Sequence, residues 1–212
     1  MPFLIILLVF GLVILFSSFF TVKQQTLAVI ERFGKFNSIR NSGLQLKVPV
    51  IDRIAGRVNL RIQQLDVIIE TQTKDNVFVK MKVSVQFKVI QEHAYEAFYK
   101  LEYPHDQITA YVFDVVRAEV PKLILDDVFV RKDDIAIAVK RELNEAMIAY
   151  GYDIINTLVT DIDPDIQVKN AMNRINAADR EKTAAEFESE AQRIRIVAKA
   201  KAEAESKRLQ GQ

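Results

Sequence analysis

The chain has 212 residues, with 29 Lys and Arg against 28 Asp and Glu, and its formal net charge of +1 gives no argument for a nucleic acid or a strongly acidic partner. It contains no Cys, which excludes disulfides, thiol catalysis, thiolate metal sites and palmitoylation. About 190 residues remain beyond the apolar N-terminus, enough for one domain or one domain with an extended element.

Residues 1–22 carry no charged side chain, and the apolar run begins at Phe3. At ~1.5 Å per residue, a helix of this length spans ~30 Å, the thickness of the hydrocarbon core of a bilayer. A cleaved signal peptide fits less well, because no basic residue precedes the run and no small-x-small cleavage site ends it. A buried core helix would carry a polar stripe, and none is present before Ser17. We therefore predict a membrane segment over residues 1–22. The large apolar side chains that we expect to insert are Phe3, Leu4, Ile5, Leu8, Phe10, Leu12, Ile14, Phe16, Phe19 and Phe20.

Basic residues are concentrated just after this segment, where Glu31 is the single acid up to residue 47. They are Lys23, Arg32, Lys35, Arg40 and Lys47. By the positive-inside rule, the segment is a single-pass anchor and the body of the protein is cytoplasmic. The alternative is a short hairpin around Gly11 that re-enters the same side, since only Met1 and Pro2 precede the run.

Two short strands are expected next. Thr26–Arg32 is β-rich and is followed by turn residues at 33–35, and Leu44–Val48 forms a second run that Pro49 closes. So close to the membrane, we expect this small sheet to lie against the headgroups, where each cation gains roughly 1 kcal/mol from anionic lipid. An ordinary solvated surface is the alternative. The cations concerned are Lys35, Arg40, Lys47, Arg53 and Arg57.

The clearest strand runs from Val77 to Val89, where every second residue is apolar. This period of two predicts one buried and one solvated face. Leu65–Thr71 is another β-rich run, and the polar residues 73–76 between the two suit a hairpin turn. We therefore expect an antiparallel sheet.

Three amphipathic helices follow, over Gln91–Leu101, from Pro104 onward and over about Asp134–Tyr150, before a strand returns at Ile154–Ile162. This order of strands, helices and a returning strand predicts an α+β domain, which we place at residues 23–165.

From residue 166 to the end, Ala, Glu, Lys, Arg and Gln dominate and no Pro or Gly occurs before Gly211, so one long helix over 166–212 is predicted. Ala recurs every seven residues, with a large apolar residue three positions later in two of the repeats. This seam of small residues predicts association with other helices, as in a wall of parallel helices. The seam residues are Ala177, Ala184, Phe187, Ala191, Ile194 and Ala198. The alternative is a solvated single helix held by i to i+4 charge pairs. The pattern stops in mid-repeat at Gln212, so we expect the helix to continue in a longer protein.

The sequence contains no recognisable catalytic or metal-binding motif. His93 and His105 lie in or beside amphipathic helices, and there is no HExxH, GxSxG or Gly-rich phosphate loop. Acidic pairs at 126–127 and 133–134 precede helical stretches, where capping and the helix dipole explain them, and 161–164 suits a strand end with a turn. We expect no enzyme activity, no cofactor and no metal.

Several short motifs occur in order along the chain. They are VIERFGKF at 29–36, SGL at 42–44, TKDNV at 73–77, DIDP at 161–164 and ADREK at 178–182. Together they resemble the stomatin, prohibitin and flotillin superfamily, also called the band 7 or SPFH family, over residues 24–212. Within that family, YVFDVVRA at 111–118 and AYGY at 149–152 look most like the plant hypersensitive-induced reaction proteins and their bacterial relatives.

The resemblance implies a membrane-anchored SPFH domain whose copies assemble into large rings or cages, with the long helices as a wall around a patch of membrane. The expected function is a non-enzymatic, homo-oligomeric scaffold that organises lipids or client proteins into a membrane microdomain. The alternative is a regulatory subunit that controls access to a membrane AAA protease or transporter. This chain departs from the hypersensitive-reaction pattern, because Pro2 stands where myristoylation needs Gly and there is no Cys to palmitoylate. The apolar segment would replace the lipid anchor.

Overall fold

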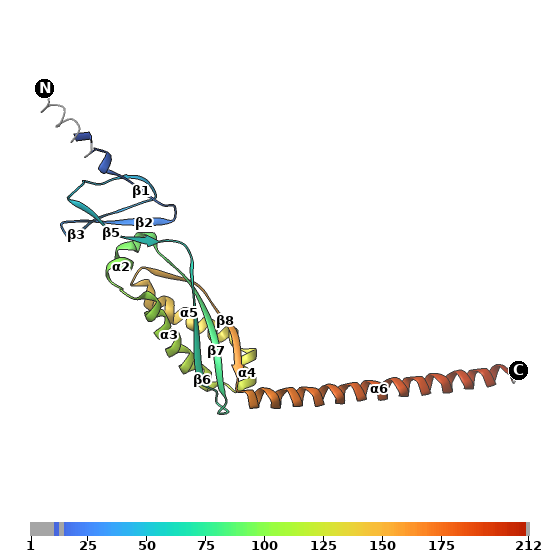
Figure 1. Cartoon of the computed structure of the whole chain (residues 1–212). Helices are drawn as coiled ribbons and strands as arrows, with labels where there is room; N and C mark the ends of the chain where they lie inside the picture. Colours follow the sequence, from blue (N-terminus) through green and yellow to red (C-terminus); the bar gives the residue numbers. More distant parts are fainter. Residues whose placement is uncertain (1–10, 13–14, 211–212) are drawn as a thin grey trace, which may run out of the picture. The chain divides into compact units, whose positions relative to one another are not determined.

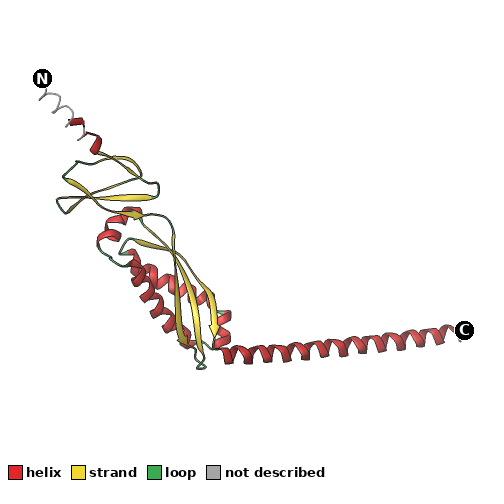
Figure 2. Cartoon of the chain, in the orientation of Figure 1, coloured by secondary structure: helices red, strands yellow, loops and turns green. Residues whose placement is uncertain are grey.

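The computed structural model describes residues 11–12 and 15–210. The chain divides into two units, Met1–Asp163 and Pro164–Gln212, of which the first combines strands and helices and the second is built from one helix (Figures 1 and 2). The elements are β1 (Phe19–Val22), β2 (Thr26–Arg32), β3 (Lys35–Arg40), β4 (Gly43–Leu46), β5 (Asp52–Asn59), β6 (Gln63–Gln72), β7 (Phe78–Val89), η1 (Gln91–His93), α2 (Ala94–Tyr99), α3 (Pro104–Glu119), η2 (Val120–Lys122), α4 (Leu125–Val130), α5 (Lys132–Ile148), β8 (Tyr152–Pro164) and α6 (Ile166–Gln210). The predicted α+β class is confirmed.

The first five strands form two small sheets. β1 and β4 pair as an antiparallel ribbon, and β2 lies between β3 and β5 in a three-stranded antiparallel sheet. As the central strand, β2 buries Leu27, Val29 and Ile30. Phe33 and Gly34, at φ 50° and 75°, form a tight turn of the kind that joins β2 and β3 without disturbing their twist. The predicted strand and the turn after it are therefore confirmed.

The larger sheet has the strand order β6-β7-β8. β6 and β7 form the predicted hairpin, with pairs from Gln63 and Phe87 to Gln72 and Phe78. Every second side chain of β7 from Val79 onward is buried, and the core is completed by α3 and α5, which pack against each other. Their buried residues are Ile108, Val112, Val115 and Val116 of α3 and Ile135, Ala136, Val139, Leu143 and Met147 of α5. The other face of the sheet is open.

The turn between β6 and β7 is fastened to the start of α4. The Thr73 hydroxyl donates to Oδ1 of Asp75 at 2.6 Å, and the same oxygen accepts the N–H of Leu125 at 3.1 Å. The Lys74 N–H donates to the Leu123 carbonyl at 2.8 Å. The hydrogen bond from Thr73 is the main reason that the pKa of Asp75 is lowered. The polar residues 73–76 therefore both close a hairpin and attach it to the helical layer.

Strand β8 contains a local irregularity. Its buried side chains are Tyr152 and Ile154 near the start but Thr157 and Val159 farther on, so the buried set changes parity. The change falls between Ile154 and Thr157.

Helix α5 bonds to β8 around this change, and residues four apart on one face of the helix make the contacts. Oδ1 of Asn144 accepts from the Ile154 N–H at 3.2 Å, Nζ of Lys140 donates to the Ile155 carbonyl at 2.7 Å, and the Thr157 hydroxyl donates to the Ala136 carbonyl at 2.6 Å. α5 thus satisfies polar groups that regular strand pairing would leave without partners.

The three-stranded sheet is attached to α2 by aromatic side chains. The Phe98 ring lies against Gly56 of β5, where a Cβ would come within 2.5 Å of the ring carbon Cε2. The Tyr99 hydroxyl donates to Oε1 of Glu31 in β2 at 2.8 Å. Desolvation, followed by this bond, raises the pKa of Tyr99 to about 12. Gly56 is therefore required by a close approach and not by its own backbone conformation.

Several elements differ from the predictions. β1, β3, β5 and α4 do not stand out in the sequence, because β3 and β5 carry several charged residues and β5 contains a Gly. Phe19–Val22, which we assigned to the end of a membrane helix, is instead strand β1. Its aromatic and β-branched residues favour extended backbone, and β4 supplies the hydrogen-bonding partner.

Most of the predicted membrane segment falls outside the described residues, including Phe3, Leu4, Ile5, Leu8, Phe10 and Ile14. Leu12 and Phe16 have helical backbone and exposed side chains. Among the helices in the described part of the chain, none has both the length and the apolar character needed to cross a bilayer.

Helix α6 is 45 residues long, which confirms the long helix predicted from residue 166. Within the second unit, every side chain from residue 173 to residue 202 is exposed. A helix this long has no core of its own to stabilise it.

Candidate interaction surfaces

One face of the β1–β4 ribbon presents apolar side chains at the surface. The register pairs Phe19 with Leu46 and Thr21 with Leu44, which places these four side chains on the same face, here called the ribbon face. Leu44 is 66% exposed and Leu46 56%, whereas Val22, on the opposite face, is buried. A cluster of exposed apolar side chains is typical of an interaction surface.

The β4–β5 loop, residues 47–51, follows the ribbon in sequence and displays a further exposed apolar side chain. Val50 is fully exposed and has a φ of 73°, which β-branched residues seldom adopt. The buried carboxylate of Asp52 holds the loop, because it accepts the Val48 N–H at 2.9 Å and Nε of Arg32 at 2.8 Å. The hydrogen bond from Arg32, followed by that from Val48, lowers the pKa of Asp52. An ion pair between the buried Asp52 carboxylate and the partly exposed Arg32 therefore supports a loop that displays an uncovered apolar side chain.

The cations that we expected near headgroups are not all gathered at the ribbon. Lys47 directly follows β4, whereas Arg53 and Arg57 are exposed on β5 of the three-stranded sheet. Lys35 and Arg40 lie at the two ends of β3, and Nε of Arg40 is buried without a hydrogen-bond partner among the described atoms.

The seam residues Ala177, Ala184, Phe187, Ala191, Ile194 and Ala198 are all exposed on α6. Phe187 is 72% exposed. Two hollows open along the helix surface. The first has a volume of 570 Å³ and is lined by Thr183, Ala184 and Phe187 among others. The second has a volume of 420 Å³ and is lined by Ile194, Val197 and Ala198 among others. Hollows between small and large side chains are what a second helix fills when it packs closely.

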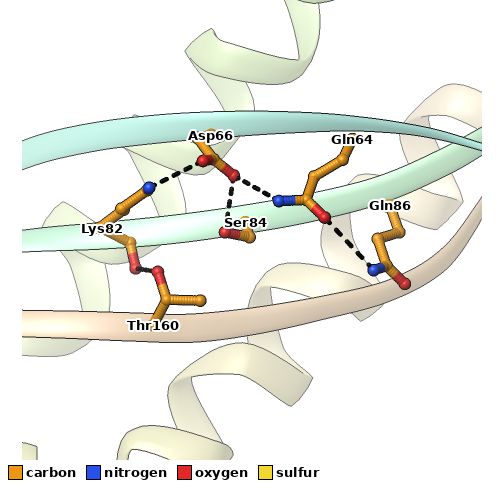
Figure 3. A network of polar contacts seen from close by, with 6 residues as sticks. All are labelled: Gln64, Asp66, Lys82, Ser84, Gln86 and Thr160. Atoms are coloured by element: carbon orange, nitrogen blue, oxygen red, sulfur yellow. Dashed lines mark hydrogen bonds and ion pairs between the residues drawn. The ribbon is translucent and has the colours of Figure 1, made fainter.

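The open face of the β6-β7-β8 sheet carries a polar network around Asp66 (Figure 3). The carboxylate of Asp66 pairs with Nζ of Lys82 at 2.8 Å and accepts from the Ser84 hydroxyl at 2.7 Å and from Nε2 of Gln64 at 2.9 Å. These three bonds, in that order, lower the pKa of Asp66 to about 2. Thr160 of β8 donates to the Lys82 carbonyl at 3.1 Å. The network cross-links neighbouring strands, and its Asp66 carboxylate is ionised at neutral pH.

The histidines do not form a catalytic arrangement. Nδ1 of His93 lies 3.7 Å from Oε2 of Glu96, and the ring of His105 packs edge-on against Phe87 with 5.7 Å between centroids. Across residues 11–12 and 15–210, no group of three or more His, Asp or Glu is placed to hold a metal ion. A hollow of 740 Å³ lined by Arg61, Lys88, Asp153 and others contains neither histidine.

Sequence reasoning identified the seam but missed the ribbon face and the β4–β5 loop. The alternation of Leu44, Leu46 and Val48 with polar residues was the available signal, since it predicts a strand with one apolar face. That alternation does not reveal whether a neighbouring element covers the face.

The SPFH domain / Band 7 family matches this chain over residues 20–205. The chain is 47% identical to hypersensitive-induced response protein 4 of Arabidopsis thaliana over 174 residues, which cover 82% of this chain and 60% of that protein. It is 30% identical to the mitochondrial stomatin-like protein 2 of Homo sapiens over 173 residues, 81% of this chain and 48% of that protein. The aligned part of this chain thus spans about half to three-fifths of the length of these relatives.

Proposed function

The chain belongs to the SPFH domain / Band 7 family, and on that basis we propose that it is a non-enzymatic membrane scaffold whose copies assemble into rings or cages and organise a membrane microdomain. The family resemblance inferred from the motifs is confirmed. The observation that carries the proposal is the uncovered apolar surface of the ribbon face and Val50, next in sequence to the apolar N-terminus. Membrane lipids and further copies of the chain are the proposed partners.

The ribbon face and the β4–β5 loop are suited to the interfacial layer of a bilayer. Leu44 and Leu46 are more than half exposed and Val50 is fully exposed. Burying side chains of this size is worth about 1–2 kcal/mol each, and each cation close to anionic lipid adds about 1 kcal/mol. The sum of several kcal/mol is comparable to the reversible binding of one myristoyl chain. This surface would therefore orient the domain on the membrane but not anchor it permanently.

Permanent anchoring is assigned in this proposal to residues 1–22, either as a span or as a re-entrant hairpin, with the body of the protein on the cytoplasmic side. The charge asymmetry after the segment supports that orientation. The strand β1 shortens the portion available to cross the bilayer, because Phe19 and Phe20 are already committed to the ribbon.

Self-association is assigned to α6. Its exposed Phe187 and Ile194 and the alanines between them would be covered by neighbouring helices. Since copies held in one bilayer share one orientation, the neighbouring helices would run parallel and form a wall.

The proposal is tested with the full chain purified from membranes in mild detergent, by chemical cross-linking and electron microscopy. We expect ring-shaped or cage-shaped particles, and a strictly monomeric particle would refute the scaffold. A membrane AAA protease or transporter that co-purifies in stoichiometric amount from native membrane would favour the regulatory-subunit alternative.

Contact between the β4–β5 loop and lipid is tested separately. This test reports on the loop itself, so membrane binding through residues 1–22 does not obscure the result. The chain has no Cys, so a single environment-sensitive dye is placed at residue 50 and, in a matched control, at residue 68 on the open sheet face, which is also exposed. On reconstitution from detergent into liposomes containing anionic lipid, the emission should shift to the blue at residue 50 and stay constant at residue 68. Equal behaviour at the two positions would exclude the β4–β5 loop as part of the lipid-facing surface.

A further inference from the structure

The charged side chains in the middle of α6 are separated by sign. Residues 179–190, the acidic segment, contain five acidic and two basic residues, and residues 193–201, the basic segment, contain four basic and no acidic residues. The acids are Asp179, Glu181, Glu186, Glu188 and Glu190, and the bases of the second segment are Arg193, Arg195, Lys199 and Lys201. All of these side chains are exposed.

Several of these charges are not placed to stabilise a single helix. Glu186 and Glu190 are four residues apart, as are Arg195 and Lys199, and like charges at that spacing repel each other. Within the helix, Glu186 approaches Lys182 at 4.0 Å and Glu190 approaches Arg193 at 3.0 Å, which leaves the sign of each segment unchanged. The helix dipole does not explain the separation either, because its influence is confined to the first and last turns and α6 begins at Ile166.

We propose that neighbouring copies of α6 pack in parallel with an axial offset of about 12 residues, or ~18 Å, so that the acidic segment of one copy faces the basic segment of the next. The inference rests on the proposed function, because copies anchored in one bilayer present their helices in the same direction. At this offset Arg174 faces Glu186 of the next copy and Glu181 faces Arg193 of the next copy. Without an offset, like-charged segments would face each other along the whole contact.

The helix geometry allows the offset to repeat from copy to copy. Residues 12 apart are about 120° apart around a helix of 3.6 residues per turn. The acidic segment of one helix can therefore face one neighbour while its basic segment faces the other neighbour. The contact is therefore heterologous, and copies that share one bilayer form a closed ring or wall through it when their helices lean from the membrane normal by the same angle. An antiparallel pair would match the same segments around Ala191, but it would place the N-terminal units at opposite ends of the pair.

Disulfide cross-linking of the full chain in liposomes measures the offset directly, because the chain contains no Cys. Ala185→Cys combined with Val197→Cys tests an offset of about 12 residues, and Ala185→Cys combined with Thr183→Cys tests helices in register. Neither pair removes a charge. We expect a ladder of cross-linked oligomers from the first pair, at several-fold higher yield than from the second. A ladder from the second pair, or dimers from Ala191→Cys alone, would overturn the proposal.

Charge reversal tests whether electrostatics sets the offset. Glu181→Arg and Arg193→Glu should each reduce the yield of the cross-linked ladder several-fold, and the double variant should restore it. Arg141→Glu, an exposed reversal on α5, is the matched control and should leave the yield unchanged. Failure of the double variant to restore cross-linking, or single variants with full yield, would exclude the charge pairing. If the unaltered chain does not self-associate at all, the proposed function fails, whereas association with the in-register ladder removes only the offset.

Discussion

Gly56→Ala tests how the three-stranded sheet β3-β2-β5 is held to α2. The added methyl carbon would lie 2.5 Å from Cε2 and 2.7 Å from Cζ of Phe98. Carbon atoms in contact are about 3.5–4.0 Å apart, so the ring or the strand has to move by about 1 Å. The Phe98 ring already packs edge-on against Tyr99, with 4.8 Å between centroids, which restricts that movement.

Overpacking of this kind costs about 1–3 kcal/mol in the free energy of unfolding. At about 2–4 °C per kcal/mol for a unit of this size, the melting temperature should fall by between about 2 and 12 °C. The measurement is thermal unfolding of the full chain in detergent, followed by near-ultraviolet circular dichroism. The chain has six Tyr and no Trp, and every Tyr lies between residues 95 and 152, so the signal reports on the first unit.

The same substitution in a Phe98→Leu background provides the control. Because leucine lacks the ring carbons that clash, Gly56→Ala should then cost less than half as much, and the difference is the coupling energy of the pair. A loss of stability that is equal in the two backgrounds would refute the close approach as the reason for glycine. No loss in the original background would refute it as well.

Three further outcomes are expected. Leu143→Ala should lower the free energy of unfolding by about 2–5 kcal/mol, because this side chain is 0% exposed. Ile148→Ala, on the exposed side of the same helix, should lower it by under about 1 kcal/mol. Equal effects of the two substitutions in denaturant titrations would contradict the assigned core. Asp66 has a folded-state pKa of about 2, below its ordinary 3.8, so the stability it contributes is present above the ordinary value and is lost as pH falls from about 4 toward 2. Asp66→Asn should flatten the decline of melting temperature in that range, and an unchanged slope would speak against the Lys82 and Ser84 bonds. Val50→Asn should leave the melting temperature equal or slightly higher, because asparagine tolerates positive φ more readily and nothing packs on Val50, while a drop of several degrees would show that the valine side chain is covered.

The elements that could be predicted are those whose side chains follow one period over a long run. β7 alternates throughout, and α5 repeats its apolar residues at helical spacing. In each case one neighbouring layer buries one face, so the period of the apolar residues predicts the type of element. β5 follows no such pattern. Its Gly56 is explained by the close approach of Phe98, which belongs to helix α2 and lies far away in the sequence. Its pairing with β2 is a tertiary effect that local residues do not encode.

The candidate surfaces divide in the same way. The seven-residue spacing along α6 can be recognised in the sequence because it depends on one helix alone, and its role as a seam stays a prediction. The ribbon face depends on the pairing of β4 with β1, and β1 was hidden inside an apolar run that favours a membrane helix. The exposed position of Val50 depends on the ion pair of Asp52 with Arg32, two residues whose proximity no local spacing indicates.

The bonds from α5 to the backbone of β8 have a consequence for contacts between molecules. β8 is an edge strand, and edges with unpaired backbone groups allow sheets of different molecules to join. Around Ile154 and Ile155, one backbone N–H and one backbone carbonyl of this strand are occupied by Asn144 and Lys140 of α5. These two groups are therefore not available to a strand of another molecule.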